Sequence, residues 1–176
     1  MRKFLGIAVL LAVSGMSFLF AEGGEGGVEA ALVTYTDAKA GFSIGHPGTW
    51  SQDTSFGAGV KFVGGDDSMT VVIANLPEGV DIKGFATKDA ATVASDYKGF
   101  KQLGLNASKD IKGAFILGFA ADGKSTVTGK AYRAHNEVYY IPLKGNRLGI
   151  VTVTGPENHY DMEGVRDIAL TLVVKK

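Results

Sequence analysis

The segment closest to a catalytic motif is Gly41-Phe-Ser-Ile-Gly45, which has the Gly-x-Ser-x-Gly spacing of the serine hydrolase nucleophile elbow. In those enzymes the serine occupies a sharp turn between a strand and a helix. Ser43 instead lies between Phe42 and Ile44, two apolar residues that share one face of an extended chain. Pro47-Gly48 follows where the helix would have to begin. The segment therefore favours a strand, and a hydrolase that uses Ser43 is the alternative reading.

Residues that bind metal ions are few and scattered. His46, His135 and His159 have no spacing that would bring them together on one strand or helix, as metal ligation requires. The segment Gly64-Gly-Asp-Asp-Ser68 carries two carboxylates, but it lacks the alternating acids and distal Glu of a calcium loop. We expect a hairpin turn there and no metal site.

Composition excludes several further functions. Cys is 0, which removes disulfides, iron–sulfur clusters, thiolate zinc sites and a lipid-modified N-terminal cysteine. Lys+Arg and Asp+Glu are 18 each, and no basic block occurs, so we expect no binding to nucleic acid. Neither a Gly-x-Gly-x-x-Gly segment nor a P-loop is found, and we expect no cofactor.

One cluster of aromatic and basic residues is a candidate binding surface. It consists of Tyr132, Arg133, His135, Tyr139 and Tyr140, and aromatic residues and Arg are enriched at binding hot spots. Tyrosines on paired strands also serve simply as cross-strand packing partners. Strand alternation places Arg133 and His135 on one face and Tyr132 on the other, so the five side chains cannot all point outward together.

The hydrophobic pattern indicates how these residues are positioned. Runs of alternating or β-branched residues predict strands over residues 32–36, 41–46, 59–63, 69–76, 114–120, 125–135, 137–143 and 147–154. Short links at 122–123, 135–136 and 144–146 indicate an antiparallel meander.

Two helices complete the predicted fold. Apolar spacings of three and four predict a helix over 82–103 that Gly104 ends. Gly155-Pro156-Glu157 predicts the start of a second helix, and Leu170 to Val174 a terminal strand. The fold class is therefore α+β: an antiparallel sheet of about seven to nine strands with two packed helices, an α/β/α-type sandwich.

The N-terminus has the pattern of a secretory signal peptide. Arg2 and Lys3 precede an apolar run from Phe4 to Phe20, and Ala21 offers a cleavage point. A retained membrane anchor is the alternative reading of this run. We predict a signal peptide over 1–21, a flexible Gly/Glu-rich tether over 22–30 and a single domain over 31–176. The protein is then exported, periplasmic or secreted, without stable membrane insertion after cleavage.

The first strands carry a family resemblance. Tyr35-Thr-Asp37, Gly41-Phe-Ser-Ile44, Pro47 and Trp50 resemble the opening of the PsbP/Mog1-like family, and the order of elements is similar over nearly the whole mature chain. Two departures are the missing lipobox cysteine and an ending, Leu170 to Val174, without the family's usual Ser-Phe. The resemblance implies a scaffold shared by photosystem accessory subunits, a nuclear-transport cofactor and exported bacterial proteins, and no particular activity.

Together these observations predict an exported, non-enzymatic accessory or binding protein. Its partner is a protein or a small ligand, bound at the sheet surface or in the groove between the sheet and the helices. A structural protein of the cell envelope is the remaining alternative.

Overall fold

A computed structural model describes residues 31–174. The predicted signal peptide (1–21) and tether (22–30) lie outside these residues and stay predictions. The elements in chain order are β1 (Leu32–Asp37), β2 (Phe42–Pro47), β3 (Ser51–Gln52), β4 (Val60–Gly64), β5 (Asp67–Asn75), α1 (Ile82–Asp96), β6 (Lys101–Ala107), β7 (Phe115–Lys124), β8 (Ala131–Pro142), β9 (Arg147–Pro156), α2 (Met162–Leu170) and β10 (Val173–Val174). None of these helices is long and apolar enough to span a membrane.

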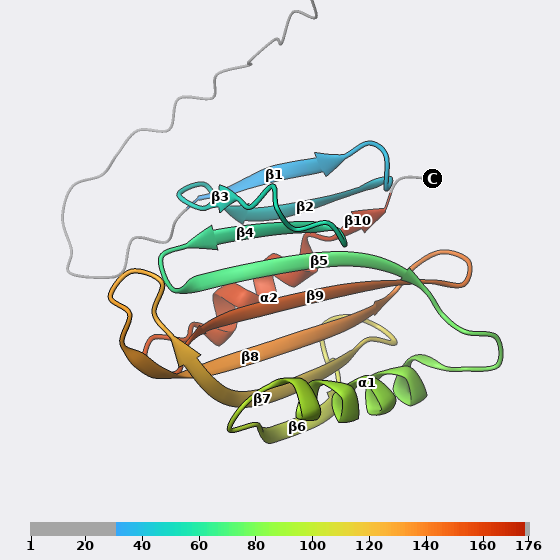
Figure 1. The fold of residues 1–176 in the computed structure, drawn as a ribbon. Coiled ribbons are helices and arrows are strands. Elements are labelled where there is room, and N and C mark those ends of the chain that lie inside the picture. The colour runs from blue at the N-terminus through green and yellow to red at the C-terminus, as the bar shows by residue number, and fades with distance from the viewer. Residues whose placement is uncertain (1–30, 175–176) are drawn as a thin grey trace, which may run out of the picture.

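The strands form two antiparallel sheets (Figure 1). The larger has the order β3-β4-β5-β9-β8-β7-β6, and the smaller has the order β1-β2-β10. The predicted meander is present in β7, β8 and β9, which are neighbours in both sequence and space. The terminal strand is present but shorter than predicted: only Val173 and Val174 pair with Ser43 and Phe42 of β2, and Leu170 still belongs to α2.

Both faces of the large sheet are apolar and both are covered. On one face α1 packs through Ala86 and Ala90 against a buried layer that includes Leu117 and Tyr140. The other face is covered by α2 together with the small sheet, and this core is the larger of the two. The predicted α+β class, with two helices packed on an antiparallel sheet, is therefore confirmed.

The first helix is shorter than predicted. It ends at Asp96, and residues 101–107 form β6 instead of continuing the helix. Gly104 is no helix cap, since it lies within β6 beside a break in the pairing register with β7. Tyr97 and Phe100 continue the apolar spacing of α1 although both residues follow its end. They are apolar because their rings pack on Phe119, with centroids 5.1 Å (Tyr97) and 5.2 Å (Phe100) from the Phe119 centroid.

Two predicted strands are a single strand. The predicted break at His135-Asn136 is wrong, because β8 continues through it. Asn136 is fully buried, and its Oδ1 accepts a 2.7 Å hydrogen bond from Thr154 Oγ1 of β9. A residue that usually marks a turn is thus satisfied inside the sheet. The link predicted at 122–123 is also wrong, because β7 runs through it and the chain reverses only after Lys124, where Ser125 Oγ accepts a hydrogen bond from Thr128 N.

The second helix begins later than predicted. Gly155 and Pro156 complete β9, and α2 starts at Met162. Asp161 is its N-cap, and its carboxylate accepts hydrogen bonds from the backbone N–H groups of Glu163 (3.1 Å) and Gly164 (3.0 Å). The two-residue edge strand β3 was not predicted from the sequence.

One threonine attaches the end of α2 to the small sheet. Thr171, the C-cap, donates a 2.6 Å hydrogen bond from Oγ1 to the Ile168 carbonyl. The same oxygen accepts a 2.7 Å hydrogen bond from the backbone N–H of Gly45 in β2. A side chain at position 45 would contact Thr171 at about 3.1 Å, so glycine permits this close approach.

We expect Thr171→Val, which keeps the volume and removes the hydroxyl, to lower the free energy of unfolding by roughly 1 to 3 kcal/mol. Thr87→Val is the matched control, because the Thr87 hydroxyl bonds only to the Lys83 carbonyl on the exposed side of α1. Urea unfolding of both variants measures the difference. Equal losses in the two would show that the link between α2 and β2 is unimportant.

Candidate functional site

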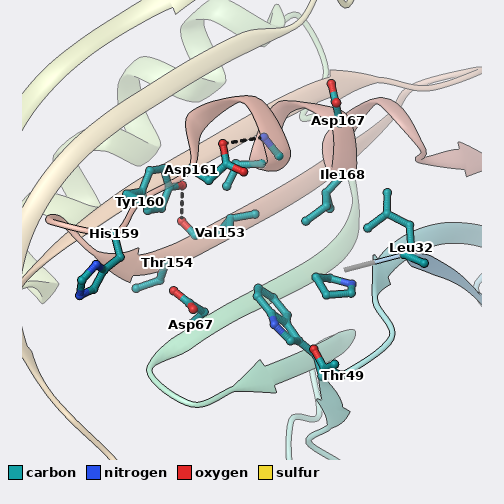
Figure 2. Close-up of a pocket in the computed structure, with 15 residues that line it drawn as sticks. Leu32, Thr49, Asp67, Val153, Thr154, His159, Tyr160, Asp161, Asp167 and Ile168 are labelled. Atoms are coloured by element: carbon teal, nitrogen blue, oxygen red, sulfur yellow. Dashed lines mark hydrogen bonds between the residues drawn. The ribbon is translucent and has the colours of Figure 1, made fainter. Parts of the chain in front are cut away.

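A cavity of about 930 Å³ opens between α2 and the start of the small sheet (Figure 2). This volume lies at the upper end of the range typical of small-molecule sites. The cavity is lined by residues from the β1–β3 region, from β5 and β9, and from the first turns of α2. It is one of the grooves between sheet and helix in which the sequence analysis placed binding.

An indole forms one wall of the cavity. Trp50, the only tryptophan in the chain, follows β2 and donates its backbone N–H to the Pro47 carbonyl at 2.9 Å. Its ring lies directly over Gly64 of β4, where any larger residue would overlap it. The backbone of Trp50 is therefore fixed by Pro47, and its indole is packed against the backbone of Gly64.

A tyrosine forms another part of the wall. Tyr160 donates a 3.2 Å hydrogen bond from its hydroxyl to the Val153 carbonyl. Its ring packs on His135 with centroids 4.2 Å apart. Burial, with the Glu137 charge second, raises the pKa of this hydroxyl well above its usual range, so the ring stays neutral.

A buried polar group lies behind Tyr160. The Glu137 carboxylate is 6% exposed and accepts a 2.7 Å hydrogen bond from the Tyr139 hydroxyl. His135 Nε2 lies 4.0 Å from Glu137 Oε1 and, within residues 31–174, has no hydrogen-bond partner. Burial, and after it the hydrogen bond to Glu137, raises the pKa of the Tyr139 hydroxyl far above its usual value. Polar groups of Glu137, Tyr139 and His135 therefore lie next to this wall of the cavity.

The carboxylates that line the cavity differ in their partners. Asp161 caps α2, and Asp167 pairs with Arg166 Nη2 at 3.3 Å. Asp67, at the start of β5, has no side-chain hydrogen bond or ion pair with any residue in the described range. Figure 2 shows its side chain directed into the cavity beside Thr154. Asp67 is therefore the cavity carboxylate that is free to bind another group.

The surroundings of Asp67 disfavour its charge. Burial, and after it the neighbouring charge of Asp66, raise the pKa of Asp67 above its ordinary value of 3.8, while His159 opposes the shift. The Asp66 carboxylate itself is turned to the β7–β8 loop, where it accepts a 2.9 Å hydrogen bond from Thr126 N. The half-buried charge of Asp67 thus costs folding free energy that His159 offsets only in part.

We expect Asp67→Asn to raise the melting temperature at pH 7 by about 1 °C, a small effect because water still screens the half-buried group. An Asp with a raised folded-state pKa binds its proton more tightly when folded, so its ionisation lowers stability as pH rises above 3.8. Thermal unfolding at pH 7 and near pH 3 measures this. The gain should vanish at the lower pH, and a loss of stability at pH 7 would contradict the expectation.

The predicted aromatic and basic cluster does not form one surface. Tyr139 is only 2% exposed, and Tyr140 is fully buried on the opposite face with its hydroxyl donating to Asp89 at 2.7 Å. Arg133 pairs with Asp122 at 3.0 Å, and the Tyr132 hydroxyl reaches the Asp66 carbonyl at 3.4 Å. Of the predicted cluster, His135 contacts Tyr160 of the cavity wall. The Tyr139 hydroxyl bonds to Glu137, whose carboxylate lies near His135.

Ser43 occupies the interior of a strand. It pairs with Thr36 of β1 on one side and with Val173 of β10 on the other. After β2 the chain continues into β3, so the strand-to-helix turn of a nucleophile elbow is absent from this part of the structure. The structure therefore gives Ser43 the strand position that the sequence favoured.

The predicted hairpin turn at residues 64–68 is present. It joins β4 to β5, and Gly65 has a φ of +66°. Within residues 31–174 no three side chains of the metal-binding types gather.

Sequence reasoning missed the residues that converge on the cavity. Trp50 stood out only as part of the family resemblance, Asp67 only as one of two carboxylates in a predicted turn, and Tyr160 not at all. They come from segments up to 110 positions apart, which local periodicity cannot bring together. The one available signal was Asp161, an acid that directly precedes the apolar spacing of α2 and marks its true start.

Comparison with known proteins identifies the architecture. No family model matches the sequence, and no curated protein does either. Among solved structures, the cyanobacterial PsbP (CyanoP) from Synechocystis sp. PCC 6803 matches with a TM-score of 0.57 at 18% identity, over 86% of this chain and 98% of that one. The chain has the PsbP/Mog1-like fold.

A second solved structure supports the same conclusion. The Ran-binding protein Mog1p of Saccharomyces cerevisiae matches with a TM-score of 0.58 at 12% identity, over 82% of this chain and 96% of that one. The likeness in fold thus covers most of this chain. At these identities the match concerns the fold, and function has to be argued from the cavity.

Proposed function

We propose that this chain is an exported, non-enzymatic accessory protein that binds its ligand in the cavity beside α2. The predicted signal peptide supports export. The shared fold supports a binding role, since Mog1p has this architecture and is a Ran-binding protein. Ser43, the residue of the hydrolase alternative, lies inside β2 and paired on both sides, which argues against catalysis there.

The observation that carries the proposal is a preformed cavity with fixed walls. The Tyr160 hydroxyl is hydrogen-bonded to the Val153 carbonyl, and the Trp50 indole packs on Gly64, so both rings are already positioned before a ligand enters. Apolar residues such as Val153 and Ile168 provide the floor, and Asp67 provides a polar group without a partner. A cleft that combines apolar surface with a few positioned polar groups is the usual form of a binding site.

Obstructing the cavity should abolish binding. Thr49 lies exposed at its rim, and Thr49→Phe places a ring across the opening. Thr87→Phe is the control, because Thr87 is equally exposed but lies on α1, which covers the other face of the sheet. Both mature variants and the unmodified protein are equilibrated with the native envelope fraction, and bound molecules are identified by mass spectrometry.

We expect at least one molecule to copurify in near-stoichiometric amount with the unmodified protein and with Thr87→Phe, and to be at least tenfold depleted on Thr49→Phe. Circular dichroism checks that all three proteins are folded. The same molecules on all three, or none on any, would contradict a binding role for the cavity.

A further inference from the structure

We propose that the cavity beside α2 binds an alkylammonium group, with Asp67 as its counter-ion and the rings of Trp50 and Tyr160 against its apolar body. This inference rests on the proposed function and adds the chemical class of the ligand. It is carried by the charges, the partners and the shapes of the residues that line the cavity (Figure 2).

The charge of the lining selects for a cation. Asp67, Asp161 and Asp167 line the cavity, and no Lys or Arg of residues 31–174 does. His159 is its one basic side chain, and it contacts Asn158 Nδ2 through Nε2 at 2.9 Å. A carboxylate or phosphate ligand would therefore meet net repulsion, and a cation would meet attraction.

The partners of the three carboxylates single out one of them. Asp161 is used by the backbone of α2, and Asp167 by Arg166. Asp67 alone of the three lacks such a partner among the described residues, and it lies half-buried with its side chain in the cavity. Burial of an unpaired carboxylate is unfavourable, and a bound ammonium group would supply both the missing charge and hydrogen-bond donors.

The aromatic walls extend the selection to the body of the ligand. Indole and phenol rings attract cations through their faces, and Trp is the strongest of the aromatic side chains in this respect. Val153, Val165 and Ile168 add aliphatic surface. An ammonium group on a short alkyl chain makes both the contact between cation and ring and the apolar contact with the aliphatic side chains, whereas a hydrated inorganic cation lacks the apolar contact.

The same group occurs in free amines and in lysine side chains. Both sources present an ammonium on a flexible alkyl chain, and the cavity chemistry treats them alike. Two kinds of probe therefore enter the test: hexylamine for the free amine, and acetyl-Gly-Lys-Gly-amide for the side chain of a peptide.

Trp50 makes the test direct, because it is the only tryptophan and it lines the cavity. The mature protein is titrated at pH 7 with hexylamine, hexan-1-ol and hexanoate while tryptophan emission is recorded. The peptide is compared with its ε-acetylated form. We expect at least one amine to bind about tenfold more tightly than its neutral counterpart, and hexanoate to bind more weakly than hexan-1-ol.

Asp67→Asn should abolish this preference, so that each amine binds no better than its neutral counterpart. Asp66→Asn is the matched control: it removes the same charge one residue away, from a carboxylate directed at Thr126 and not at the cavity. That variant should keep at least half of the preference. If only hexylamine shows the preference, the ligand is a free amine. If only the lysine peptide shows it, the ligand is a lysine side chain of a partner protein.

Two results would overturn the proposal. Equal binding of amines and neutral counterparts would show that charge is not selected, and an unchanged preference in Asp67→Asn would show that Asp67 is not the counter-ion. If Thr49→Phe still blocks capture of an envelope molecule, the binding function stands and only the ligand class fails. If capture is unaffected as well, the proposed function fails too.

Discussion

The architecture depends on covering a long sheet face with a short helix. The nine residues of α2 extend about 14 Å, whereas a twelve-residue strand such as β8 extends about 40 Å. The apolar residues beyond the helix must be shielded by something else, and the small sheet β1-β2-β10 supplies that shield. Thr171 fastens the two covers together at one end of α2. Toward the start of α2 the cavity lies between the two covers, lined by Gly164 and Val165 of the helix and by Leu32 and Pro47 of the small sheet.

This arrangement explains why unfavourable polar groups gather in one region. Elsewhere in the core, Asn136 accepts a hydrogen bond from Thr154, and the Tyr140 hydroxyl donates one to Asp89. Around the cavity, Asp67 lacks a partner and His135 Nε2 is buried without one. Folding alone gains nothing from either group. Local departures from good packing and polar satisfaction, in a chain that otherwise obeys both, are typical of binding sites.

The fold class was accessible from the sequence because strand and helix periods differ and turn residues separate most elements. Errors arose where tertiary contacts overrode local pattern. Tyr97 and Phe100 continue a helical spacing only because both pack on Phe119, and Asn136 looks like a turn residue but bonds within the sheet. The cavity was less accessible still. Asp67 and Trp50 meet only through the pairing of strands, which single-sequence patterns do not specify.

The irregular pairing of β6 has a consequence for how molecules of this protein meet one another. In the described part of the chain β6 forms one end of the large sheet, so its outer backbone groups face away from any neighbouring strand. The shift between Gln102 and Gly104 interrupts the regular ladder, and Lys101 places a charge at its start. A second molecule approaching this border finds no long, straight template for strand addition. The irregular pairing of β6 thus disfavours edge-to-edge pairing of two molecules along this border.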